Sequence, residues 1–168
     1  ADHVLIHDAA RPLVPSQIVR RVVSALRRGH PAVVPALRVT DTIKRITASD
    51  AQAAVAAAEA AEGFGEPASL RDGPSDFRVE RVETTLNRSA LRAMQTPQGF
   101  ALEAIRRAHS AFADRAASEL NAAPDDAALA EAAGIPVVLV RGSERAMKIT
   151  RRFDLRIAEL LLADPALC

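Results

Sequence analysis

The 168-residue chain has little of three things that each indicate a special class of protein: cysteine, long hydrophobic runs and net charge. Its one cysteine is Cys168, so it has no internal disulfide framework and no cysteine pair for a metal ribbon, which agrees with a reducing cytoplasm. No apolar run reaches the roughly 18 residues that span a bilayer, and the start at Ala1–Val4 has neither part of a secretory signal. We therefore expect a soluble, cytoplasmic protein that does not enter a membrane.

Charge of one sign is also lacking. The 22 Lys and Arg residues against 21 Asp and Glu leave a net charge of +1, so no strong field favours nucleic acid or an acidic membrane surface. Any phosphate site must therefore be built locally. With 49% hydrophobic and 26% charged residues, the chain fits one globular domain with a real core. Because it starts with Ala1 just ahead of the apolar run Val4–Ile6, we expect a truncated chain.

Patterns typical of strands and helices alternate along the sequence. Val4–Ile6 predicts a strand, Ser16 predicts the N-cap of an amphipathic helix over Gln17–Arg28, and Ala32–Val34 predicts the next strand. This unit has the length of a right-handed βαβ crossover. We therefore expect an α/β fold with a doubly wound, mostly parallel sheet.

The alternation continues in the second half of the chain. Apolar residues at helical spacing predict a helix over Ala101–Leu120, with His109 packed on its apolar stripe. Asp125 or Asp126 is expected to cap a short helix that Gly134 closes. The last two expected elements are a parallel-type strand at Val137–Val140 and a helix that Thr150 caps and that runs through Leu162.

The composition changes between Ala48 and Asp76. This stretch is made of Ala, Glu, Gly, Pro, Ser and Asp with almost no branched apolar residues, so it cannot supply a core. We expect a flexible insertion at about residues 48–76.

The loop at residues 7–12 follows the first predicted strand, where open α/β sheets bind their ligands. Asp8 offers hard oxygen ligands to Mg²⁺, and Arg11 offers a planar fork to phosphate oxygens. The small Ala9 and Ala10 would let a ligand approach the backbone. The other interpretation of the same spacing is an Asx-turn at Asp8 with a solvated Arg11, and spacing alone does not settle between them.

Two more segments carry polar side chains that suit a site. Residues 40–45 alternate as a strand would, with Thr40, Thr42 and Lys44 on one face, which fits either a polar cleft or an ordinary half-exposed strand. Residues 142–150 follow the strand at Val137–Val140 and offer Lys148 as a point charge, again with a functional and a plain structural interpretation both open.

Some residues give no mechanism by themselves. Arg88 and Thr96 show no pattern that indicates chemistry. The four histidines have no metal-ligand spacing, and we assign catalysis to none of them: His3, His7, His30 and His109.

Five motifs in this order resemble the 2-C-methyl-D-erythritol 4-phosphate cytidylyltransferases. They are HDAARP, VTDTIKR, LNRSALRAMQTPQGF, PDDAALAEAAGIPV and GSERAMKIT, and together they cover nearly the whole chain apart from residues 48–76. The similar ribitol-5-phosphate cytidylyltransferases tend to carry HDAVRP, so HDAARP favours the first family. Ribitol-5-phosphate cytidylyltransferase and a non-catalytic dimerisation or binding module stay as alternatives.

The resemblance implies a nucleotidyltransferase fold and a reaction. In that reaction the phosphate of methylerythritol phosphate attacks the α-phosphorus of CTP with Mg²⁺ present, and pyrophosphate leaves. Asp8 would touch the metal and the substrate, Lys148 would hold the attacking phosphate, and Ala9 would approach the nucleotide. Further implied site residues are Arg11 and Thr42 at the methylerythritol phosphate, and the catalytic Arg88 with the substrate-binding Thr96.

The resemblance also implies a homodimer. An arm at about residues 39–86 would cross to the partner, so that Arg88 and Thr96 complete the other subunit's site. Two departures stand out: the opening Gly-rich loop that binds CTP, and the N-terminal strands with it, are missing, and the insertion at 48–76 falls inside the arm. We therefore expect no catalysis by this chain alone. Some family members are fused to a cyclodiphosphate synthase domain, which could follow Cys168.

Overall fold

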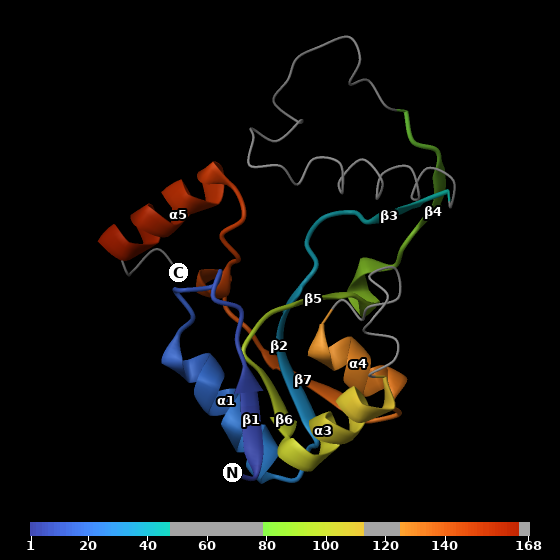
Figure 1. The fold of residues 1–168 in the computed structure, drawn as a ribbon. Helices are drawn as coiled ribbons and strands as arrows, with labels where there is room; N and C mark the ends of the chain where they lie inside the picture. The colour runs from blue at the N-terminus through green and yellow to red at the C-terminus, as the bar shows by residue number, and fades with distance from the viewer. Residues whose placement is uncertain (48–78, 113–124, 165–168) are drawn as a thin grey trace. The chain divides into compact units, whose positions relative to one another are not determined.

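The computed structural model describes residues 1–47, 79–112 and 125–164 (Figure 1). The chain divides into two compact units. The first unit comprises residues 1–38 and 92–168, and the second comprises residues 39–91. The predicted insertion at 48–76 and the last part of the helix predicted to reach Leu120 lie outside the described residues.

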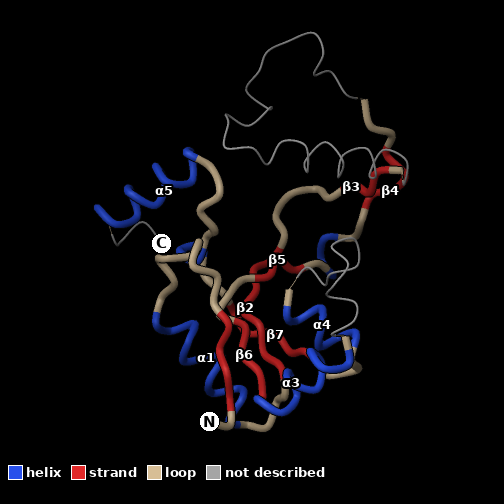
Figure 2. Tube along the Cα trace, viewed as in Figure 1, coloured by secondary structure: helices blue, strands red, loops and turns tan. Residues whose placement is uncertain are grey.

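A mixed sheet forms the centre of the first unit (Figure 2). Its strand order is β1-β6-β2-β5, with β7 beside β2. In the register, Phe100 of β6 lies opposite both Val4 of β1 and Ala32 of β2, so β6 separates the two strands predicted to form the first crossover. The strands are β1 (His3–Ile6), β2 (Ala32–Arg38), β5 (Arg92–Met94), β6 (Gln98–Ala101) and β7 (Val137–Arg141).

The α/β class is confirmed, but the expectation of a mostly parallel sheet is wrong for the described strands. Only β2 and β7 form a parallel pair, whereas β5 and β6 run antiparallel to their neighbours. Neither β5 nor β6 is among the strands that the sequence pattern predicts. Gly99 explains how β6 fits there, since a Cβ at this position would lie 2.4 Å from Cγ1 of Val22 on the helix that covers the strand.

Helices cover both faces of this sheet. On one face, α1 (Ser16–Arg27) packs Ile18, Val22 and Leu26 against Val33 of β2. Neighbouring residues of a strand point to opposite faces, so Ala32 contributes to a second cluster. That cluster joins β6 to α3 (Leu102–Ala111) and α4 (Asp126–Ala132), and its buried members are Ala32, Phe100, Ile105, Ala108 and Ala130.

One of the three predicted helix caps is present in the structure. Asp125 caps α4 as expected, since its carboxylate accepts the Ala128 N–H at 2.7 Å. Ser16 does not cap α1, because it is already the first helical residue after Pro15. Thr150 does not cap α5 (Arg152–Ala163) either: the Asp154 carboxylate accepts its N–H, at 2.9 Å, and stabilises the helix start instead.

The prediction that His109 packs in the core is wrong. Its side chain is 58% exposed, and Nε2 lies 2.8 Å from Oδ1 of Asp126. The buried face of α3 is formed by Ala104, Ile105 and Ala108. The buried side of α3 therefore does not include His109, which lies on the exposed side and contacts the first residue of α4.

The second unit contains a short two-stranded sheet made of β3 (Lys44–Ile46) and β4 (Val82–Thr85). The predicted strand at 40–45 is wrong over residues 40–43, because the pairing with β4 begins only at Lys44. The carbonyl of Thr40 instead accepts a hydrogen bond from Nη1 of Arg88, which starts a single 3-10 turn.

Candidate functional site

Two loops of the first unit meet at one edge of the sheet. Strands β1 and β7 both run parallel to β2, so the loops that follow them leave the sheet at the same end. The backbone N–H of Ile149 donates to the carbonyl of Ala10 at 2.8 Å and joins the two loops. This contact brings together Asp8 and Lys148, which lie far apart in the sequence.

Asp8 is the centre of this cluster. Its Oδ2 lies 3.1 Å from Nζ of Lys148 and 3.9 Å from Nε of Arg11, while Oδ1 accepts the Ala10 N–H at 3.0 Å. Partial burial of the carboxylate acts to raise the pKa of Asp8, but the Ala10 hydrogen bond and the charges of Lys148 and Arg11 together lower it. Asp8 therefore makes the Asx-turn and the ion pair at once, and stays ionised near neutral pH.

Arg11 is not solvated, as the alternative interpretation of the loop at residues 7–12 had it. Only 14% of it is exposed, and Nη1 donates to the carbonyl of Ala146 at 2.7 Å while Nη2 donates to that of Met94 at 3.5 Å. Its Nε is buried without a hydrogen-bond partner among the described residues. The guanidinium thus ties the loop after β1 to the end of β5 and to the turn that precedes Lys148.

Thr96, just ahead of β6, contacts the same loop within its own chain. Its Oγ1 accepts the backbone N–H of Asp8 at 3.1 Å and lies 2.8 Å from Nδ1 of His7. The peptide bond between Thr96 and Pro97 is cis. Sequence reasoning gave His7 no role, since neither its spacing nor its neighbours indicated this contact.

A buried glutamine supports the site, and sequence reasoning missed it. Gln95 is 5% exposed; its Nε2 donates to the carbonyl of Ser143 at 2.8 Å and its Oε1 accepts the Ser143 N–H at 3.0 Å. A Cβ on Gly142 would lie 2.2 Å from that Oε1, so glycine is needed for the close approach. The sequence could have pointed to Gln95 only as a polar residue directly after the short strand β5.

The other predicted site residues are Ala9, Thr42 and Arg88. Ala9 is exposed in the loop between Asp8 and Ala10. Thr42 and Arg88 belong to the second unit, where Thr42 is exposed and Arg88 bonds to Thr40. Their roles stay predictions.

Asp8 offers Mg²⁺ one carboxylate at this edge of the sheet. Over the described ranges, no group of three or more His, Cys, Asp or Glu side chains could hold a metal ion. Mg²⁺ at phosphate-transfer sites is bound by one or two carboxylates together with substrate phosphates. The single carboxylate of Asp8 fits an ion that is carried in with a nucleotide, and does not fit a metal site made of protein ligands alone.

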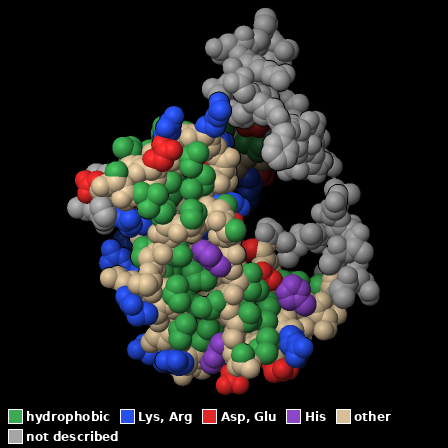
Figure 3. Space-filling view, turned by 60° about the vertical axis from the view of Figure 1, so that its left-hand side comes forward, with side chains coloured by type: hydrophobic (Ala, Val, Ile, Leu, Met, Phe, Trp, Pro, Cys, Tyr) green, Lys and Arg blue, Asp and Glu red, His purple; other side chains and the backbone are tan. Residues whose placement is uncertain are grey.

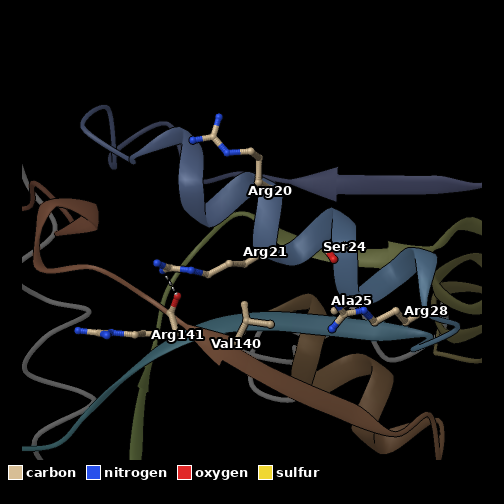
Figure 4. A pocket seen from close by; sticks show the side chains of 7 residues that line it. All are labelled: Arg20, Arg21, Ser24, Ala25, Arg28, Val140 and Arg141. Carbon is tan, nitrogen blue, oxygen red and sulfur yellow. Dashed lines mark hydrogen bonds between the residues drawn. The ribbon is translucent and has the colours of Figure 1, made fainter.

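Two surface depressions lie beside α1 and β7. One, of about 450 Å³, runs between α1 and β7 and is lined by Arg20, Arg21, Arg28 and Arg141 together with Ser24, Ala25 and Val140 (Figure 4). Nη1 of Arg21 donates to the carbonyl of Arg141 at 2.8 Å. The other, of about 430 Å³, lies beside it. Neither is lined by Asp8 or Lys148.

Hydrophobic side chains gather on one face of the molecule (Figure 3). On α5 the exposed ones include Phe153 at 72% and Leu162 at 64%, and Leu5 of β1 is 36% exposed. Among the described helices, none is both long enough and apolar enough to cross a membrane.

Known proteins resemble this chain in sequence and structure. The family model described as 2-C-methyl-D-erythritol 4-phosphate cytidylyltransferase matches residues 1–69 and 55–164. A protein of that name from Streptomyces avermitilis is 42% identical over 162 residues, which are 96% of this chain and 52% of the relative. The "Bifunctional enzyme IspD/IspF" of Paracoccus denitrificans is 38% identical over 96% of this chain and 33% of its own length.

The crystal structure of 2-C-methyl-D-erythritol 4-phosphate cytidylyltransferase from Thermus thermophilus has the same fold. It matches with a TM-score of 0.67 and 35% identity, over 96% of this chain and 62% of that one. The chain spans about half the length of the Streptomyces relative. Since the family model covers almost every residue, the chain belongs to the 2-C-methyl-D-erythritol 4-phosphate cytidylyltransferase family.

Proposed function

We propose that the protein transfers the cytidylyl group of CTP to 2-C-methyl-D-erythritol 4-phosphate and releases pyrophosphate. The family membership supports the reaction class. The observation that carries the proposal is the pairing of Lys148 with Asp8 at 3.1 Å, on loops that follow two strands of the same direction. This is the sheet edge at which open α/β folds bind nucleotides.

Lys148 is the residue that meets the attacking phosphate. Its ammonium is half exposed, so an anionic substrate can reach it, and Asp8 holds it in place beforehand. A phosphate oxygen of methylerythritol phosphate forms a bond to the α-phosphorus of CTP. The bond from the α-phosphorus to the oxygen that bridges it to the β-phosphorus breaks, and that oxygen leaves with the pyrophosphate. Fixed positive charge lowers the barrier, because two anions must approach each other in this step.

A divalent cation would be held by Asp8 and the phosphates of CTP. Magnesium supplies charge neutralisation on the triphosphate when it is bound. The lowered pKa of Asp8 keeps this carboxylate ionised and able to accept the cation. Ala9 has only a methyl side chain and leaves the loop backbone open to the nucleotide.

Arg88 and Thr42 extend the proposal to a homodimer. Both lie in the second unit, residues 39–91, which contains the arm predicted at 39–86. We assign them to the substrate site across the dimer interface, with Arg88 adding a second positive charge. Thr96 contacts Asp8 of its own chain, so the geometry favours a role for it beside Lys148 of the same chain.

The experiment is a pyrophosphate-release assay on the protein made from the complete reading frame that contains this sequence. CTP, Mg²⁺ and methylerythritol phosphate should give turnover, and ribitol 5-phosphate should give none. Turnover with ribitol phosphate alone would move the protein to the sister activity. No turnover with either substrate, in a protein that is folded by circular dichroism, would leave the non-catalytic module as the better account.

A further inference from the structure

His7 lies beside the site without a role in the proposed reaction. Its ring nitrogen Nδ1 is 2.8 Å from Oγ1 of Thr96, and the same oxygen accepts the backbone N–H of Asp8 at 3.1 Å. Thr96 and His7 are 89 residues apart in sequence, so the contact depends on β6 lying next to β1.

A threonine hydroxyl has one proton to donate and two lone pairs that accept. The Asp8 N–H occupies one lone pair of Thr96. The contact with His7 can form in two ways, with the proton supplied either by Thr96 or by Nδ1 of His7. The choice decides whether the Thr96 hydroxyl offers a ligand a proton or a lone pair. If Thr96 donates to a bare Nδ1, only a lone pair is left. If Nδ1 carries the proton and donates to Oγ1, both lone pairs are used and the hydroxyl proton is free.

Only one of these two arrangements lets Thr96 donate a hydrogen bond to the phosphate of the substrate. Ionised phosphate oxygens accept hydrogen bonds and have no proton to give. A Thr96 hydroxyl with only a lone pair left would repel them, whereas a hydroxyl with a free proton can donate to them. The partly buried position of Thr96, next to the loop that carries Asp8, makes this difference matter because water competes less there.

We propose that His7 is a positioning residue, which donates from Nδ1 to Thr96 so that the hydroxyl proton of Thr96 points at a phosphate oxygen of the substrate. The inference rests on the proposed function, since it takes methylerythritol phosphate as the ligand. It places the ring proton of His7 on Nδ1 in the substrate-free protein.

A pair of nearly isosteric variants tests the donor directly. In His7→Asn the side-chain amide can take the place of Nδ1–H and donate to Thr96. In His7→Leu the shape is similar but no donor is present. We expect the Asn variant to keep kcat/KM for methylerythritol phosphate within about threefold. The Leu variant should lose about tenfold, because the Thr96 hydroxyl stays free to donate but is no longer held in one orientation toward the phosphate.

The loss in His7→Leu should fall on KM for methylerythritol phosphate and leave KM for CTP unchanged. A defect in folding would lower the amount of active enzyme and would not separate the two substrates. His30→Asn is the control, since His30 is exposed just beyond the end of α1 and should behave as wild type.

Nitrogen-15 NMR of histidine-labelled protein gives the second readout, with the His7 signals identified by their absence in His7→Asn. A proton on Nδ1 supports the inference, and a bare Nδ1 beside a protonated Nε2 overturns it. Equal KM values in wild type and His7→Leu overturn it too. An inactive wild type would count against the proposed function, whereas the NMR result would still decide where the proton of His7 lies.

Discussion

Two basic regions of the first unit make an instructive comparison. The loop cluster contains two positive side chains, Lys148 and Arg11, whereas the depression between α1 and β7 is lined by four arginines (Figure 4). In the cluster a carboxylate and backbone carbonyls hold the charges in place, and a buried glutamine fixes the backbone of Ser143 in the loop that leads to Lys148. Among the described residues that line the depression, none is a carboxylate, and Arg21 donates to a backbone carbonyl. Fixed geometry, more than the number of charges, distinguishes a candidate active site.

The largest effect should come from removing the ammonium of the cluster. We expect Lys148→Met to lower kcat/KM by about 10² to 10³, the usual cost of losing one group that stabilises charge in the transition state. Arg141→Met in the depression should change it less than about twofold. Pyrophosphate release measures both. Equal losses in the two variants would remove the distinction between the regions.

Stability should separate the two regions as well. Arg11→Met leaves the carbonyls of Ala146 and Met94 without their donor in a place where the side chain is 14% exposed, so we expect a loss of about 2 kcal/mol in the free energy of unfolding. Arg21→Met should cost under about 0.5 kcal/mol, since its contact is exposed. Urea titrations followed by circular dichroism give both values. A larger loss of unfolding free energy in Arg21→Met than in Arg11→Met would contradict the conclusion that Arg11 holds the loops of the cluster together.

The response to acid should sharpen the comparison further. The pKa of Asp8 is lowered in the folded state from the ordinary 3.8, so its contribution to stability is present above that value and is lost as the pH falls through the folded pKa. Asp8→Asn should therefore be less stable than wild type at about pH 6, and the gap should close below pH 3.8. Urea midpoints across that range measure it. A constant gap would show that the carboxylate charge is not what Asp8 contributes.

The smallest effect should be seen at the exposed arginines of the depression. Changing Arg20 and Arg28 together to Gln is expected to alter kcat/KM and the urea midpoint by amounts within experimental error, because exposed positions away from buried partners contribute little. A clear loss of kcat/KM would show that these arginines contribute to activity, and a clear loss of the urea midpoint would show that they contribute to stability.

Local patterns predicted a good part of this molecule. The strand at Val4–Ile6, the helix after Ser16, the cap at Asp125 and the parallel strand at Val137–Val140 follow from spacing within a few residues, and all are present. The loops at the ends of β1 and β7 could be placed because strands of one direction end at one edge.

The parts that sequence reasoning missed depend on contacts between distant segments. Neither β5 nor β6 has a run of apolar residues, and the direction of β6 is fixed by its neighbours β1 and β2. The contacts of Thr96 with Asp8 and His7 span 88 and 89 residues, so no window of the sequence contains them. Gln95 and Gln98 could have been suspected as polar residues in a buried stretch, but their partners could not be named in advance.

The hydrogen bond from Ile149 to Ala10 has a consequence for how the site opens. Because this amide is protected only while both loops are in place, its exchange with solvent deuterium reports a concerted opening of the loops at β1 and β7. Arg11 adds to the coupling by donating to Ala146 on the opposite loop. We therefore expect the two loops to open together, so that the opening which exposes the Ile149 amide also separates Lys148 from Asp8.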